Sequence, residues 1–175
     1  MKLDDLSLAS IRNVDSATIK SFSSGDEDLD LFLWNDALGY DQYGVTATTV
    51  VFLNGDPVPA GFFSLSADGI KLSDGEVFEL GIPFETPVAF FPAVKLTKLA
   101  TREDLQSNGL GSLVLKLVQG LVFSENISVR LLTVNAVNRR RTVAFYEREG
   151  FLPSLAVKHA NPETVLMLLD LFADR

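Results

Sequence analysis

The sequence predicts an α/β or α+β fold built on a mixed sheet. Two observations lead to this prediction. Strand-like and helix-like segments follow one another in the order β-α-β-β, a loop-rich insert, and then β-α-β-α-β-β. The chain has 175 residues, 47% of them hydrophobic, which is enough for a single domain over residues 1–175 with one full core.

The predicted strands are short runs rich in β-branched and apolar residues, separated by turn-forming residues. Asn54-Gly55-Asp56-Pro57 has the composition of a hairpin turn between two of them. We expect the first strand to lie at the edge of the sheet. The strands are predicted at residues 7–12, 46–53, 59–66, 92–101 and 128–134, from Phe151 onward, and at 164–171.

Three helices are predicted from apolar residues that recur every three or four positions. The first covers about 27–40 and is capped by Asp26 or Ser24. The third ends at Glu149, with Gly150 as its C′ glycine, and is capped by Asn135 or Asn138. The second covers 109–123, and its expected buried face consists of Leu110, Leu113, Val114, Leu117, Val118 and Leu121.

Residues 67–92 form the loop-rich insert of this prediction. They contain three Gly and three Pro residues, which favour turns over regular elements. Such a segment is typical of a functional loop and equally of a plain connection.

Composition excludes several classes of protein. No apolar run approaches the ~20 residues of a membrane span, and the acidic N-terminus lacks a signal-peptide core, so we expect a cytoplasmic protein. The absence of cysteine excludes disulfides, thiolate metal sites and a cysteine nucleophile. With His159 as the single histidine, we expect no metal site and no catalytic role for that residue.

The charge of the chain bears on its partners. A formal net charge of −8 disfavours nucleic acid, because contacts with phosphate require Lys and Arg. A local basic patch remains open around Arg139–Arg141 and Arg148.

One loop has the sequence expected of a pyrophosphate site. Gln106-x-x-Gly109-x-Gly111 lies between a predicted strand and a predicted helix. The first turn of a helix offers unpaired N–H groups and positive potential, and glycines let phosphates approach the main chain. Val114 stands where a Rossmann fingerprint has its third glycine, and no Gly-Lys-Ser/Thr follows, so both of those motifs are excluded.

A second motif adds specificity. Asn138 is followed by Ala144-Phe145-Tyr146-Glu147 and by Gly150-Phe151. The ordered pair of motifs resembles the GNAT superfamily of acetyltransferases, and this resemblance implies a mostly antiparallel sheet flanked by helices. Three upstream segments are similar to GNAT proteins of the toxin–antitoxin kind, which acetylate the amino group of aminoacyl-tRNA: Phe22 to Leu33, Gly61 to Ser66, and Pro92 to Ala100.

The resemblance implies acetyl-coenzyme A as cofactor. The strand residues Leu99, Ala100 and Thr101 would pair with the pantetheine arm. Asn138 would hydrogen-bond the arm or cap its helix, and Tyr146 would protonate the departing thiolate, since a phenol of pKa about 10 suits that work. The pyrophosphate would lie on N–H groups of Gln106, Ser107, Asn108, Gly109, Leu110, Gly111 and Ser112.

The general base is less defined. Many relatives carry a Glu on the central strand, where this chain has Lys95 and Lys98, so Asp68, Glu79 or Glu85 could act through water, or no dedicated base exists. The two lysines would flank a channel for an acidic acceptor or lie at solvated positions. Arg139–Arg141 could contact the 3′-phosphate of the cofactor or a tRNA backbone, or be solvated.

The resulting functional prediction is an N-acetyltransferase acting on a small-molecule or peptide amine by direct attack. The alternatives are toxin-like acetylation of aminoacyl-tRNA, and a protein that binds acetyl-coenzyme A without turnover. Members of the superfamily often dimerise, so a homodimer is compatible with the resemblance. We expect Trp34 to pack in the core or beside the substrate.

Overall fold

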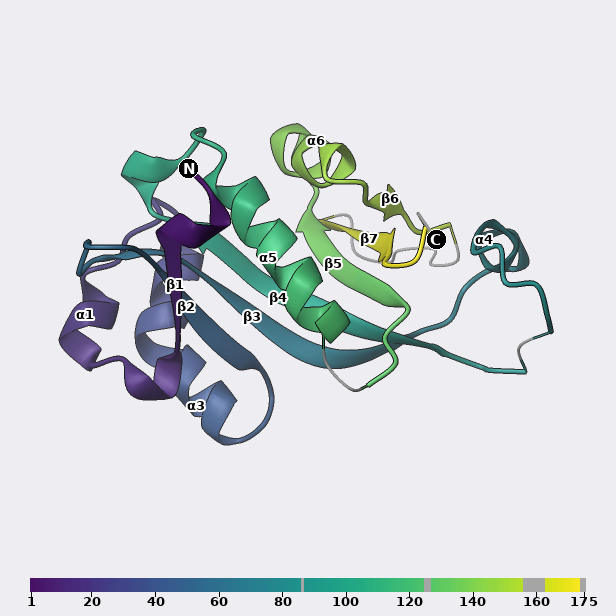
Figure 1. Ribbon diagram of the computed structural model, residues 1–175, viewed down its shortest axis with the longest axis horizontal. Helices are drawn as coiled ribbons and strands as arrows, with labels where there is room; N and C mark the ends of the chain where they lie inside the picture. Colours follow the sequence, from purple (N-terminus) through teal and green to yellow (C-terminus); the bar gives the residue numbers. More distant parts are fainter. Residues whose placement is uncertain (86, 125–126, 156–162, 174–175) are drawn as a thin grey trace. The chain divides into compact units, whose positions relative to one another are not determined.

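The computed structural model describes residues 1–85, 87–124, 127–155 and 163–173. Figure 1 shows the course of the chain. The strands are β1 Leu6–Ser10, β2 Ala47–Leu53, β3 Pro59–Ile70, β4 Phe91–Thr101, β5 Leu131–Val137, β6 Leu152–Pro153 and β7 Thr164–Asp170. The α-helices are α1 Ser16–Lys20, α2 Glu27–Leu31, α3 Ala37–Gln42, α4 Asp74–Glu79, α5 Leu110–Ser124 and α6 Arg140–Arg148. Shorter helical segments are η1 Leu3–Asp5, η2 Ile11–Asn13, η3 Phe32–Asp36 and η4 Glu103–Leu105.

The strands form one seven-stranded sheet in the order β1-β2-β3-β4-β5-β7-β6. The pairs β1–β2, β2–β3, β5–β7 and β6–β7 are antiparallel. This mostly antiparallel sheet with helices confirms the predicted fold class, and β1 lies at an edge as expected. No helix within the described ranges is both long and apolar enough to cross a membrane.

By its internal contacts the chain divides into two compact units, each described by itself below. The first unit comprises residues 1–66 and 96–118, and the second comprises residues 67–95 and 119–175. The long strands β3 and β4 pass from one unit into the other.

In the first unit, β2 pairs with both β1 and β3, and a hairpin turn joins β2 to β3. Asp56 donates its N–H to the carbonyl oxygen of Leu53 at 2.9 Å, which closes the predicted turn after β2. Alternate residues of β2 and β3 face opposite sides of the sheet. The side that carries Val50 and Phe62 is covered by α1 to α3 (Figure 1). That core consists of Ile11, Ile19, Phe22, Phe32, Leu33, Ala37, Val50, Phe62 and Ala100.

The helix predicted at 27–40 is present as α2, η3 and α3, a continuous helical segment with π-type geometry in its middle. Asp26 caps it by accepting the N–H of Leu29. Trp34 donates its indole N–H to the carbonyl oxygen of Phe22 at 3.1 Å, which fits the expected packing role. The preceding helix α1 was not predicted, although Asp15 caps it by accepting the N–H of Thr18.

In the second unit, β7 pairs with both β5 and β6, and α6 contacts β5. The strand predicted at 128–134 lies three residues further along, at 131–137. Arg130 precedes it and donates to Asp170 at 2.6 Å and to the carbonyl oxygen of Leu80 at 2.7 Å. Its side chain therefore connects the start of β5 to the end of β7 and to the segment after α4.

The predicted cap of the third helix was wrong. Asn135 belongs to β5, where it pairs with Leu166, and the N-cap of α6 is Arg139, which makes no side-chain capping bond. The end of the helix is as predicted. Gly150 has a φ of 90°, and the N–H of Phe151 donates to the carbonyl oxygen of Tyr146 at 3.0 Å, which is the Schellman pattern.

The insert at 67–92 is more regular than predicted. It contains the end of β3, the start of β4 and the helix α4 between them (Figure 1). Ser73 and Glu76 form a capping box at the start of α4. Val77 and Leu80 pack against a small core around Phe91. The pattern Ser-x-x-Glu is present in the sequence, but its two middle residues, Asp74-Gly75, favour a turn.

Candidate functional site

The end of β4 carries the first three predicted cofactor residues. Ala100 is buried, whereas Leu99 and Thr101 are half-buried. A Cβ atom at Gly61 of β3 would lie 2.7 Å from the carbonyl oxygen of Ala100, which is closer than a real Cβ approaches. The N–H of Arg102 donates to the carbonyl oxygen of Ala60 at 2.8 Å. The absence of a side chain at position 61 therefore allows this close approach of the two strands.

The predicted pyrophosphate loop leads from β4 into α5. Ser107 and Gly109 both have a positive φ, of 64° and 82°. The first helical hydrogen bond runs from the N–H of Leu113 to the carbonyl oxygen of Gly109 at 3.0 Å, so the N–H groups of Leu110 and Gly111 precede it. Open space surrounds the position of a Cβ at Gly109. This geometry fits an anionic group held by main-chain donors at the start of a 15-residue helix.

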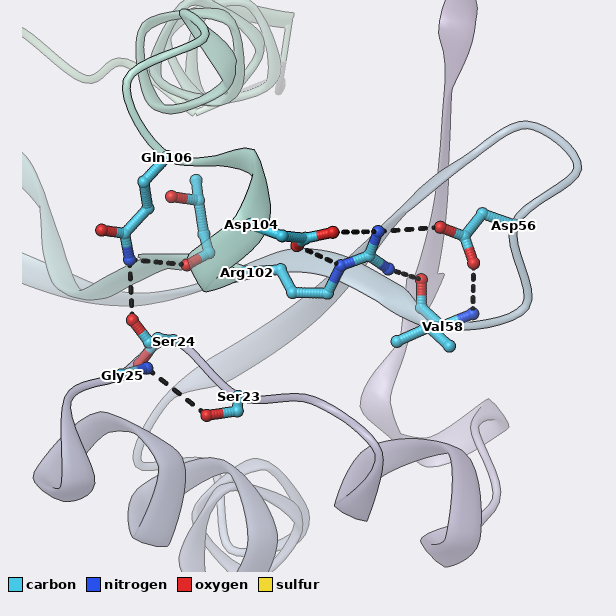
Figure 2. Close-up of polar contacts among 9 residues, drawn as sticks. Ser23, Ser24, Gly25, Asp56, Val58, Arg102, Asp104 and Gln106 are labelled. Carbon is cyan, nitrogen blue, oxygen red and sulfur yellow. Dashed lines mark hydrogen bonds and ion pairs between the residues drawn. The ribbon is translucent and has the colours of Figure 1, made fainter.

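Arg102 holds one side of this loop (Figure 2). Its guanidinium donates to Asp104 at 2.7 Å and to the carbonyl oxygen of Val58 at 3.2 Å, and it forms an ion pair with Asp56 at 2.9 Å. The bond to Asp104, opposed by partial burial and reinforced by Asp56, raises the pKa of Arg102. The N–H of Val58 and then Arg102 lower the pKa of Asp56. The charge of Asp104 is thereby compensated beside a site that would hold an anion.

Ser23 and Ser24 contact the other side of the loop, and Figure 2 shows the contact of Ser24 with Gln106. Gln106 donates its side-chain amide to the carbonyl oxygen of Ser24 at 2.7 Å and to that of Thr101 at 3.3 Å. The N–H of Glu103 donates to the carbonyl oxygen of Ser23 at 3.0 Å. These contacts were not predicted, because no local pattern relates the two segments.

The remaining predicted residues, Asn138 and Tyr146, belong to the second unit. Asn138 is exposed at the end of β5, and its N–H donates to the carbonyl oxygen of Glu163 at 2.7 Å. It does not cap α6, since the N-cap is Arg139.

Tyr146 is 7% exposed on the last turn of α6. Its ring makes edge contacts with Phe145 and Phe151, at centroid distances of 5.1 and 5.4 Å. Burial raises the pKa of Tyr146 to about 12. The phenol therefore keeps its proton throughout the neutral range.

The three candidate bases differ in their surroundings. Asp68 accepts the hydroxyl of Thr133 at 2.8 Å and the N–H of Gly69 at 2.9 Å, whereas Glu79 and Glu85 are exposed. A further carboxylate, Glu76, was not predicted. Burial acts to raise the pKa of Glu76, but hydrogen bonds from Ser73, Leu155 and Ser154 outweigh it and lower that pKa.

The basic residues considered above lie in two places, on β4 and at α6. Lys98 lies over the ring of Phe32, with Nζ 5.2 Å from the centroid, and Lys95 is half-buried. Arg139–Arg141 and Arg148 have exposed side chains along α6. Within the described ranges no cluster of three or more His, Cys, Asp or Glu side chains could hold a metal ion. His159 lies outside the described residues.

No protein-family model and no curated protein sequence matches this chain. Solved structures do. A Tyr-to-Phe mutant of the toxin AtaT is 19% identical with a TM-score of 0.76, over 97% of this chain and 92% of that chain. AtaT complexed with acetyl-methionyl-tRNAfMet is also 19% identical, with a TM-score of 0.73, over 93% of this chain and 94% of that chain.

A Tyr-to-Phe mutant of KacT is 22% identical with a TM-score of 0.73, over 95% of both chains. The chain therefore has the fold of these toxins along nearly its whole length. This confirms the fold that the resemblance to toxin-like GNAT proteins predicted.

Proposed function

We propose that this chain is an acetyl-coenzyme A-dependent N-acetyltransferase whose acceptor is the α-amino group of an aminoacyl-tRNA. One observation carries the proposal. A glycine-bearing loop opens α5 in a fold that the chain shares with AtaT, a toxin solved with acetyl-coenzyme A and with acetyl-methionyl-tRNAfMet. This likeness favours the aminoacyl-tRNA acceptor over the unspecified small amine expected from the sequence.

The loop supplies the binding part of the proposal. The N–H groups of Leu110 and Gly111 and the dipole of α5 attract a pyrophosphate, while Arg102 compensates the nearby Asp104. Leu99, Ala100 and Thr101 are proposed to pair with the pantetheine arm, with Asn138 as a further partner. Bound acetyl-coenzyme A supplies an acetyl group already activated as a thioester.

Tyr146 is proposed as the general acid. Because burial raises the pKa of Tyr146 to about 12, the phenol has a proton to donate at neutral pH. Because a thiol has a pKa of about 8.5, transfer of that proton to the thiolate is uphill while the phenol stays buried, so the proposal requires bound cofactor to offset the effect of burial on Tyr146.

The carboxylates support an α-amino acceptor. Asp68 and Glu76 are already engaged as hydrogen-bond acceptors, and Glu79 and Glu85 are solvated. The hydrogen bonds that hold Glu76 also lower its pKa, which makes it a weaker base. An α-amino group of pKa about 7.7–8.0 is substantially neutral near pH 7.5, whereas a lysine amine of pKa about 10.4 is not. The former can attack with little help from a base.

The exposed arginines of α6 support the tRNA part. Arg139, Arg140 and Arg148 are exposed in α6 or at its N-cap, so basic groups are available locally despite the net charge of −8. Phosphate contacts depend on such local groups, although the acidic remainder of the chain lowers the overall attraction.

The direct test uses radiolabelled acetyl-coenzyme A with a panel of aminoacyl-tRNAs, the free amino acids and small primary amines. We expect acid-precipitable label on one or more aminoacyl-tRNAs, sensitive to alkaline hydrolysis of the ester. Label on small amines alone would refute the tRNA acceptor. Absence of coenzyme A release with every acceptor would refute the enzyme and leave a binding protein.

A further inference from the structure

We propose that Asp30 is a positioning residue for the pyrophosphate loop, acting through Ser24 and the side chain of Gln106. The inference rests on the proposed function, because it concerns the loop assigned to acetyl-coenzyme A. The set formed by Asp30, Ser23, Ser24 and Gln106 is called the loop brace below.

Asp30 fixes the serine pair. Its carboxylate is buried, with 5% of the residue exposed. One oxygen accepts the N–H of Ser24 at 2.8 Å and its hydroxyl at 2.7 Å, and the other accepts the hydroxyl of Ser23 at 2.9 Å. A carboxylate only accepts hydrogen bonds, so these three of the four donors of the serine pair turn toward it.

The same two serines hold the loop with their carbonyl oxygens. Ser24 accepts the amide of Gln106 at 2.7 Å, and Ser23 accepts the N–H of Glu103 at 3.0 Å. Figure 2 shows the amide of Gln106 directed at the Ser24 carbonyl from the opposite segment. The helix α2 thereby helps, through Asp30, to fix the stretch of coil whose carbonyl oxygens face the loop.

Gln106 acts within the brace by its side chain. Its main-chain N–H already donates to the carbonyl oxygen of Glu103 at 3.2 Å, which leaves its amide as the group that ties the loop to Ser24 and Thr101. Gln106 stands three residues before Gly109, so a shift of its position is passed to the first turn of α5. We therefore assign Gln106 a positioning role instead of a direct contact with phosphate.

The sign of the electrostatic effect makes the inference testable. Asp30→Asn removes a negative charge, and charge alone would leave the affinity for anionic acetyl-coenzyme A unchanged or raise it. The brace predicts the opposite, because an asparagine amide cannot accept from all three donors. The matched control is Asp28→Asn, which removes an equal charge from an exposed position of the same helix.

The experiment measures the Kd of acetyl-coenzyme A for the wild type, Asp28→Asn, Asp30→Asn, Gln106→Met and the double variant Asp30→Asn/Gln106→Met. Thermal melts confirm that each protein is folded. We expect Asp30→Asn and Gln106→Met each to weaken binding about fivefold to tenfold, as for the loss of a buried hydrogen bond. The double variant should be little worse than either, because both changes break one brace.

A second readout separates positioning from general damage. With S-acetylpantetheine, which lacks the pyrophosphate, kcat/KM of folded Asp30→Asn should stay within about twofold of wild type, since this variant affects only pyrophosphate binding. Equal losses with both acetyl donors, full additivity in the double variant, or unchanged acetyl-coenzyme A affinity in Asp30→Asn would overturn the inference. Failure of the wild type to bind acetyl-coenzyme A would instead refute the proposed function.

Discussion

The pyrophosphate loop and the turn that holds Tyr146 are fixed in different ways. The loop depends on residues far away in the sequence, since Gln106 bonds to a residue 82 positions away and Arg102 to one 44 positions away. Tyr146 depends on near neighbours, namely Phe145, Phe151 and the main-chain bonds that end α6. The loop is therefore open to disturbance from distant parts of its unit, whereas the setting of Tyr146 is local.

Charge separates the two units as well. The first unit holds 12 of the 23 acidic residues and 6 of the 15 basic ones, a net charge of −6, which leaves −2 for the second unit. Most of the acidic excess that argued against tRNA therefore lies in the unit of the loop. The exposed arginines of α6 lie in the other.

The largest effect is expected at Tyr146, where a single substitution tests the proposed difference between catalysis and cofactor binding. Tyr146→Phe should lower kcat about 100-fold or more, in the range of a lost general acid, and leave the Kd of acetyl-coenzyme A unchanged. Phe keeps the ring contacts, so stability should stay close to wild type. Steady-state kinetics and calorimetry on one preparation check both parts. Unchanged kcat would remove Tyr146 from the mechanism.

The local setting of Tyr146 also predicts a dependence of stability on pH. Burial raises its pKa to about 12 in the folded protein, against about 10 when unfolded. The stabilisation is complete below pH 10 and is lost as pH rises toward 12, by about 3 kcal/mol. Urea unfolding of the wild type and Tyr146→Phe from pH 9 to 12 measures the difference. Parallel curves for the two proteins would show that burial does not perturb this phenol.

A smaller effect tests the first unit at the contact of β3 with β4. Gly61→Ala places a Cβ 2.7 Å from the carbonyl oxygen of Ala100 and should cost about 2 kcal/mol of unfolding free energy. It should also weaken acetyl-coenzyme A binding, because Ala100 is proposed to contact the pantetheine arm. Gly39→Ala on α3 is the control. That position has open space, so alanine should stabilise by up to about 1 kcal/mol. Equal results for the two variants would show that the close approach does not matter.

The smallest effect is expected at Glu76 in the second unit. A substitution there should lower stability and leave the cofactor affinity of the loop in the first unit unchanged. Glu76→Gln should cost about 1 kcal/mol at pH 7 through weaker hydrogen bonds with Ser73, Ser154 and Leu155, with no change in cofactor affinity. The folded-state pKa is lowered, so this contribution is present above pH about 4.5 and fades as pH falls further. Glu79→Gln, on the same helix and exposed, is the control. A loss of acetyl-coenzyme A affinity in Glu76→Gln would contradict the separation.

Sequence patterns predicted the elements whose signals are local. The hairpin before Pro59, the cap by Asp26 and the end of α6 at Gly150 all follow from residue types at fixed spacings. The expected buried face of α5 was only partly right. Leu115 and Val122 are buried, whereas Leu121 is 36% exposed, because tertiary packing decides which side of an almost wholly apolar helix is covered.

The residues of the candidate site also differ in whether a local sequence pattern identifies them. The two glycines of the loop and Tyr146 could be identified from motifs. The partners Ser24 and Arg102 could not be identified, because their bonds join segments that are distant in sequence, and Asp30 could not because it reaches the loop only through the serine pair. The cap at Asn138 was wrong because β5 continues to Val137 and displaces the start of α6.

The central claim is that the loop before α5 binds acetyl-coenzyme A. Titration calorimetry of the purified chain with acetyl-coenzyme A tests it most directly, with Gly109→Val as the variant that disturbs the positive φ of the loop. We predict one site with a Kd of about micromolar order, equivalent to about 8 kcal/mol, and a clear loss of affinity in the variant. Absence of heat at millimolar cofactor would contradict the claim and leave a protein with the fold of these toxins and no cofactor site.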